Sequence, residues 1–82
     1  MERKNENIKI KETTSIQLAS YLLAKGCTLK GLNRKQPEKI VFILESGDIE
    51  SLADEYLSYK GSIDPRRLFS AHDDLKALVF ET

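Results

Sequence analysis

The sequence predicts a single small domain of the α+β class, and three observations lead to that prediction. Apolar residues recur at helical spacings in three segments, and residues 40–44 form an uninterrupted run of β-branched, aromatic and aliphatic side chains. The first pattern is typical of helices, and the second is typical of a buried strand. With 82 residues, the chain is also shorter than the usual domain of about 100–150 residues, so a second domain is excluded.

The N-terminal part is expected to contain an arm and the first helix. Residues 1–11 are mostly polar or charged and form a predicted mobile basic arm, which includes a short strand signal where isoleucine alternates with lysine. The folded domain is then predicted to span residues 12–82. Within it, cap residues with hydroxyl groups precede a helical apolar pattern and Gly26 follows it, so a helix is expected over residues 15–25.

A strand hairpin is predicted next. Residues 28–34 and 40–44 are the expected strands, and the polar segment 34–39 with its proline joins them. Gly31 marks a bulge or a close backbone approach within the first of these strands. Because an all-apolar strand needs cover on both faces, we expect helices on one face and the N-terminal strand or a second copy of the chain on the other.

Two further helices complete the predicted domain. The second begins after Asp48 and carries apolar residues at i, i+3, i+4, i+7 and i+8, and Gly61 is its expected end. The third starts at the cap residue Asp64 with Pro65 at the first helical position, and it is expected to run to about Val79. The predicted architecture is therefore a short strand, a helix, two strands and two helices, with an antiparallel hairpin packed against the three helices.

Charge is distributed unevenly along the chain. The 13 basic and 13 acidic residues cancel, but residues 1–39 hold nine basic against four acidic residues, a net charge of +5. Residues 40–82 hold four basic against nine acidic residues, a net charge of −5. This composition excludes disorder and a uniformly basic nucleic-acid protein. The asymmetry predicts a dipolar domain whose field orients its partners.

Basic side chains gather in the predicted hairpin and at the start of the third helix. Arg66 and Arg67 oppose the dipole of that helix by about 0.3–1 kcal/mol, which indicates ion pairs with Asp64 or the second helix, or contact with a partner. The candidate partner-binding residues are Lys30, Arg34, Lys35, Lys39, Arg66 and Arg67. They suit an acidic protein surface, including that of a second copy, or the phosphates of a nucleic acid. They equally keep an exposed sheet edge soluble.

The sequence contains no pattern that indicates catalysis. His72 is followed directly by two aspartates, which point away from it around a helix, so the i, i+4 spacing of metal ligands is missing. Cys27 is the only cysteine and is expected to be a small buried apolar residue. The glycines occur singly, so no phosphate-binding loop is expected. We therefore predict a non-enzymatic domain with no catalytic residue, no metal and no cofactor.

The expected location is the cytoplasm. The longest apolar run is residues 40–44, against about 18 residues for a membrane helix, and the N-terminus is charged where a signal peptide is apolar. No membrane contact is expected. A domain of this size buries only about 60% of its unfolded surface, so a homodimer through the hairpin is a further candidate assembly.

Several segments together resemble a family of small domains of unknown function. The segments are residues 18–26, 40–44, 55–57, 63–68 and 75–78. That family occurs in viruses, phages included, in archaea and in bacteria, and the likeness covers about residues 12–80. Its most specific part is the segment Ile-Asp-Pro-Arg-Arg-Leu at residues 63–68, whereas the basic arm departs from the family pattern. The family has no activity to carry over, so the resemblance implies an organisation and a phage or mobile-element context.

These observations favour a small non-enzymatic module for protein–protein interaction. The resemblance implies an accessory factor or inhibitor of the kind that phages and mobile elements use. Nucleic-acid binding through the basic hairpin and the N-terminal arm is the alternative.

Overall fold

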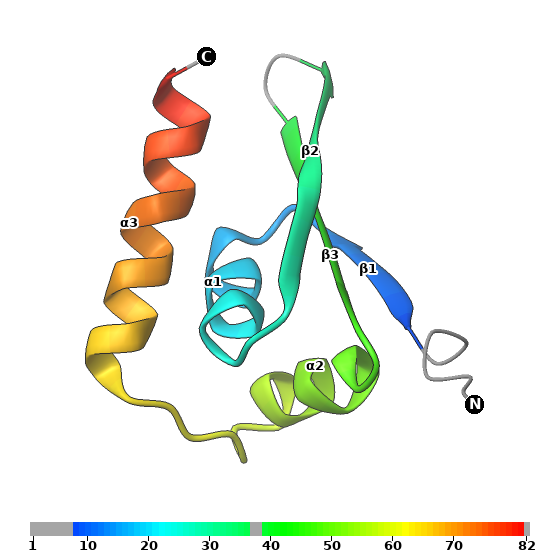
Figure 1. The fold of residues 1–82 in the computed structure, drawn as a ribbon, viewed down its shortest axis with the longest axis vertical. Helices are drawn as coiled ribbons and strands as arrows, with labels where there is room; N and C mark the ends of the chain where they lie inside the picture. Colours follow the sequence, from blue (N-terminus) through cyan, green and yellow to red (C-terminus); the bar gives the residue numbers. More distant parts are fainter. Residues whose placement is uncertain (1–7, 37–38, 82) are drawn as a thin grey trace, which may run out of the picture.

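The computed structural model describes residues 8–36 and 39–81, which form a three-stranded antiparallel sheet and three helices (Figure 1). The α+β class and the hairpin packed against helices are confirmed. The predicted arm lies outside the described residues over positions 1–7. In chain order the elements are β1 (Lys9–Thr13), α1 (Ile16–Ala24), β2 (Thr28–Gln36), β3 (Lys39–Ser46), α2 (Ile49–Leu57) and α3 (Pro65–Glu81).

The strand β3 is the central strand of the sheet, between β1 and β2. Lys11 of β1 and Leu29 of β2 both lie opposite Leu44, one on each edge of β3. The expectation that the N-terminal strand folds over the second face of residues 40–44 is wrong, because β1 pairs through its backbone with the edge of β3. The apolar run therefore belongs to a strand that is paired on both edges.

The helix α1 lies between the sheet and α3 and contacts both, as well as α2 (Figure 1). On β3, Phe42 and Leu44 are buried in the core, whereas Val41 and Ile43 point to the opposite face and are half-buried. One hydrophobic cluster joins all these layers. Its buried members are Leu18, Ala19, Tyr21, Leu22, Cys27, Phe42, Leu44, Ile49, Leu52, Ala53 and Leu75.

The end of α1 is the one predicted. Gly26 has φ of 105°, in the left-handed region that favours glycine. The amide of Cys27 donates to the carbonyl of Leu22 at 3.0 Å, and the amide of Gly26 donates to that of Leu23 at 3.1 Å. These two bonds form a Schellman motif, which satisfies carbonyls that the helix itself leaves free.

The end of α2 differs from the prediction, because the helix stops well before Gly61. The left-handed residue is instead Tyr59, with φ of 62°. The amide of Lys60 donates to the carbonyl of Glu55 at 3.0 Å, and the amide of Tyr59 donates to that of Tyr56 at 3.3 Å. The motif is the same as at the end of α1, but a tyrosine stands where α1 has a glycine.

The start of α3 is confirmed. Asp64 accepts a hydrogen bond from the amide of Arg66 at 2.9 Å, and Pro65 is the first helical residue. This is the arrangement of an N-cap, which satisfies one of the free amides of the first turn. The helix runs past its expected end at Val79 to Glu81.

Candidate functional site

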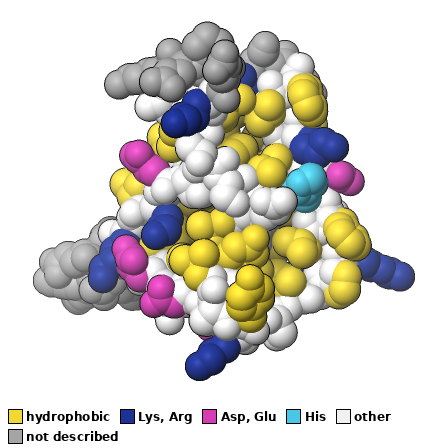
Figure 2. All heavy atoms as spheres, turned by 180° about the vertical axis from the view of Figure 1, so that it is seen from behind, with side chains coloured by type: hydrophobic (Ala, Val, Ile, Leu, Met, Phe, Trp, Pro, Cys, Tyr) yellow, Lys and Arg dark blue, Asp and Glu magenta, His cyan; other side chains and the backbone are white. Residues whose placement is uncertain are grey.

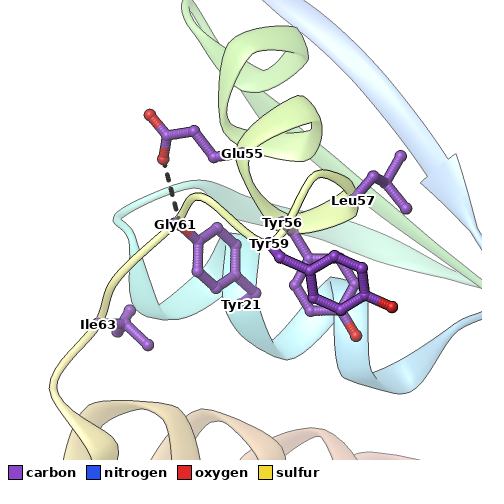
Figure 3. A pocket seen from close by; sticks show the side chains of 7 residues that line it. All are labelled: Tyr21, Glu55, Tyr56, Leu57, Tyr59, Gly61 and Ile63. Carbon is purple, nitrogen blue, oxygen red and sulfur yellow. Dashed lines mark hydrogen bonds between the residues drawn. The ribbon is translucent and has the colours of Figure 1, made fainter.

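A pocket of about 400 Å³ opens where α1, the end of α2 and the segment 58–64 meet (Figure 3). The chain contains three tyrosines, and all of them line this pocket. We call it the tyrosine pocket. Its lining residues are Tyr21, Glu55, Tyr56, Leu57, Tyr59, Gly61 and Ile63.

The floor of the tyrosine pocket is the buried side chain of Tyr21, which comes from α1. Its hydroxyl donates a hydrogen bond to Oε1 of Glu55 on α2 at 3.1 Å (Figure 3). Its ring packs against that of Tyr56, with 5.4 Å between the centroids and a tilt of 47°. These contacts join two helices that are distant in sequence, so the floor is fixed by the fold.

Gly61 lies directly against the hydroxyl of Tyr21. A Cβ at position 61 would collide with that oxygen and with the ring carbon that carries it. Because Tyr21 is buried and hydrogen-bonded, moving its side chain aside would cost free energy. Glycine is therefore required here by a close approach, and not as the stop of α2.

Tyr59 forms the outer wall of the pocket and has an unusual conformation. A left-handed backbone costs a non-glycine residue about 1–2 kcal/mol. The side chain of Tyr59 is 96% exposed, so its ring buries almost no surface to offset this cost. Within the domain, nothing about folding explains an aromatic residue at this position.

Glu55 is the one charged residue among the described residues that line the pocket. It forms no salt bridge with any described residue. The sequence of α2 has Glu50, Asp54 and Glu55 and no basic residue. Lys25 contacts Tyr21, with Nζ at 5.7 Å from the ring centroid, but it lines the two neighbouring hollows and not the tyrosine pocket.

Burial raises the pKa of Tyr21 above its ordinary value, and the hydrogen bond to Glu55 and the negative charge of that residue raise it further. The hydroxyl therefore keeps its proton at neutral pH and acts as a donor. As a donor to Oε1, it holds the carboxylate of Glu55 at the pocket.

The basic residues predicted in the hairpin do not form one free surface. Nζ of Lys30 lies 3.7 Å from Oε1 of Glu45. Arg34 donates from Nη2 to the carbonyls of Leu78 at 3.0 Å and Val79 at 3.3 Å, in the last turns of α3 where helix carbonyls lack intrahelical donors. Two of the candidate partner-binding residues therefore have partners within the domain.

Of the remaining two hairpin candidates, Lys35 and Lys39, the structure describes the side chain of Lys39 only. Lys39 is exposed at the start of β3. The side chain of Lys35 lies outside the described residues. Lys30 itself is the extra residue of the predicted bulge, since the pairing shifts between Leu29 and Gly31.

Arg66 and Arg67 lie at the opposite end of α3 from the residues that Arg34 contacts. Since α3 has 17 residues, about 25 Å separates its ends. The predicted ion pairs of these arginines with Asp64 or α2 do not form within the described part of the chain, because Asp64 caps the backbone of α3 instead. With Lys25, the two arginines border a hollow of about 510 Å³.

The predictions for the remaining polar residues are simpler. Cys27 is buried, as expected for a small apolar residue, and its pKa is raised mainly by burial. His72 is half-buried, and Asp73 and Asp74 are exposed. Over residues 8–36 and 39–81, no three histidine, cysteine or acidic residues are grouped to hold a metal ion. None of the described helices has the length and apolar character that crossing a membrane requires.

Sequence reasoning missed the tyrosine pocket. The spacing placed Tyr56 on the apolar stripe of α2, and Gly61 was the obvious helix stop. The signal that identifies the pocket is a mismatch: the left-handed position after α2 is Tyr59, although a glycine stands two residues later. That mismatch becomes visible only when the end of the helix is known.

Comparison of the chain with protein-family models, with curated proteins and with solved structures gives no match. The resemblance to the family of small domains of unknown function therefore stays a prediction. The class of protein that the fold defines is a small α+β domain with an aromatic surface pocket.

We expect Gly61→Ala to lower the free energy of unfolding by about 1–3 kcal/mol, because the added methyl group meets the hydroxyl of Tyr21. Urea denaturation measures this. Gly31→Ala is the matched control, since a Cβ there meets no atom within 4 Å. Equal effects of the two substitutions would contradict the proposed packing.

We expect stability to fall at alkaline pH. The folded state holds the proton of Tyr21 more tightly than the unfolded chain, whose ordinary pKa is 10.0. This contribution is therefore fully present below about pH 10 and is lost as the pH rises through the raised folded value. Urea denaturation at about pH 8 and pH 10.5 should show a larger loss for the wild type than for Tyr21→Phe. An equal loss in both proteins would show that Tyr21 is not the cause.

Proposed function

We propose that this domain is a small protein-binding module without catalysis, and that its binding surface centres on the tyrosine pocket. The supporting observation is Tyr59, which combines a left-handed backbone with an almost fully exposed ring. Strained residues of this kind concentrate at functional sites. Tyrosine is also among the residues that contribute most to binding energy at protein interfaces.

The surface near the helices supports a protein partner. Figure 2 shows hydrophobic side chains gathered on the face opposite to that of Figure 1. Leu57 beside the pocket is 62% exposed, and Phe69 and Phe80 of α3 are 66% and 77% exposed. The two phenylalanines are 11 residues apart, about three helical turns, so they point to the same side of α3. Apolar side chains that gather on one face, as in Figure 2, are typical of an interaction surface.

The resemblance adds a context to this proposal. A phage or mobile-element accessory factor or inhibitor in the cytoplasm acts by binding a macromolecule, as the proposed module does. A second copy of the chain, docking through the hairpin, stays a prediction.

We expect Tyr59→Gly to raise the free energy of unfolding by about 1 kcal/mol, because glycine relieves the left-handed backbone and no buried contact is lost. The same variant should lose partner binding. Urea denaturation gives the first quantity. A stability gain together with a binding loss is the signature of a residue that serves function at the expense of folding.

Partner binding is measured by photocrosslinking in cells that express the protein with benzoylphenylalanine at position 59. On illumination this residue forms a covalent adduct with a protein that contacts it. Thr14, which is exposed on the segment before α1, is the control position. We expect one discrete protein adduct from position 59 only, which excess wild-type protein suppresses and excess Tyr59→Gly protein does not. Equal adducts from both positions, or no adduct from position 59, would refute the proposal.

Nucleic-acid binding is the second candidate function. It is favoured by Arg66 and Arg67, whose guanidinium groups form no salt bridge with any described residue and border a hollow together with Lys25. The hairpin contributes less to this candidate, since Lys30 and Arg34 have partners within the domain.

Under the protein-binding proposal, we expect no measurable binding to mixed-sequence DNA at about 50 mM salt. Fluorescence anisotropy with labelled duplex measures this. Binding that weakens steeply with salt, and that the double substitution of Arg66 and Arg67 by glutamate abolishes, would support the second candidate instead. The double substitution of Lys60 and Lys76 by glutamate is the control, since both residues are exposed and the net charge changes by the same amount.

A further inference from the structure

We propose that the tyrosine pocket receives a positively charged side chain, arginine or lysine, of the protein partner. This inference rests on the proposed function and adds the chemistry of the group that enters the pocket. The volume of about 400 Å³ lies within the range of about 300–1,000 Å³ that is usual for ligand pockets.

Glu55 supplies the negative charge that such a side chain needs. Its Oε1 accepts the hydrogen bond of Tyr21, while Oε2, which points away from the tyrosine rings in Figure 3, accepts no hydrogen bond from any described residue. The rest of the lining is aromatic or aliphatic, apart from the backbone of Gly61. A carboxylate with such neighbours attracts a cation more strongly than one surrounded by water, because the apolar walls lower the local dielectric constant.

The aromatic rings provide a second attraction. The face of a tyrosine ring attracts a cation within about 6 Å of its centroid. Within the domain, Lys25 already makes this contact with Tyr21, at 5.7 Å and from the side of the neighbouring hollows. The rings of Tyr56 and Tyr59 have no cation above them in the described part of the chain. They are therefore free to accept one from a partner.

The field around the pocket favours the same kind of group. Residues 40–82 have a net charge of −5, and α2 has three acidic residues and no basic one. Lys60, which follows Tyr59, is exposed and forms no salt bridge with Glu55 among the described contacts. The acidic residues of α2 attract a basic partner segment, whereas Lys25, Arg66 and Arg67 line the neighbouring hollow.

The test is an NMR titration of the ¹⁵N-labelled full chain with N-acetyl-arginine amide. N-acetyl-citrulline amide is the matched neutral probe, since it has nearly the same shape and no charge. We expect saturable shifts at the amides of residues 55–63, with an affinity at least about fivefold higher for the arginine probe at constant ionic strength. N-acetyl-glutamate amide should cause no such shifts.

Two variants distinguish the effect of the Glu55 carboxylate on arginine affinity from the effect of the net charge of the domain. Glu55→Gln keeps an acceptor for Tyr21 and removes the charge, and we expect it to weaken arginine binding about fivefold or more. Asp54→Asn changes the net charge equally at an exposed neighbouring position, and less than about a twofold effect is expected. The dispersion of each spectrum shows whether the variant is folded.

Equal affinities for arginine and citrulline, or equal losses in Glu55→Gln and Asp54→Asn, would overturn the inference. If a variant does not fold, the affinities of the wild-type protein for the arginine and citrulline probes are sufficient to test the inference. A specific protein adduct at position 59 without arginine binding would reject the cationic group and leave the proposed function in place. Arginine binding without an adduct would reject the proposed function.

Discussion

The structure depends on the burial of one short helix from nearly all sides. α1 contacts the sheet, α2 and α3, and Ala19 and Leu22 are fully buried. A helix that is apolar on most of its surface is stable in water only when other elements enclose it. This constraint places the two longer-range partners, α2 and α3, against α1. It also fixes Tyr21, which supplies the floor of the tyrosine pocket.

The two helix ends that flank this core show how stability and function separate. α1 and α2 both end in a Schellman motif, with Gly26 at the left-handed position in one and Tyr59 in the other. Glycine at that position is the choice that folding favours. The tyrosine is less favourable for folding and gains no buried contact, so a surface role explains it best.

The charged residues also divide into those that stabilise the fold and those that remain available to a partner. In the basic half, Lys30 pairs with Glu45 and Arg34 binds the last turns of α3, so part of the positive charge maintains the fold. The helix α2 has three acidic residues and no basic one, and Oε2 of Glu55 accepts no hydrogen bond from any described residue. The charges without an ion-pair partner among the described residues therefore include Glu55, beside the aromatic rings, as well as Arg66 and Arg67, although the basic hairpin was the more conspicuous feature of the sequence.

The sequence by itself determined the features that depend on interactions between residues close together in the chain. The period of the apolar residues predicts three helices and a hairpin, and the hydroxyl residues 13–15, Gly26 and Asp64 predict where helices begin or end. The structure selects Ser15 among the three hydroxyl residues, since its side chain accepts a hydrogen bond from the amide of Leu18. Tertiary structure alone decided that β1 pairs with β3, that Arg34 meets α3, and that Tyr21 and Glu55, 34 residues apart, share a hydrogen bond. Such contacts depend on how elements pack, because an edge strand or a side chain has several partners of similar local preference. The net charge of zero followed from composition, but which of its charges remain free for a partner followed only from the fold.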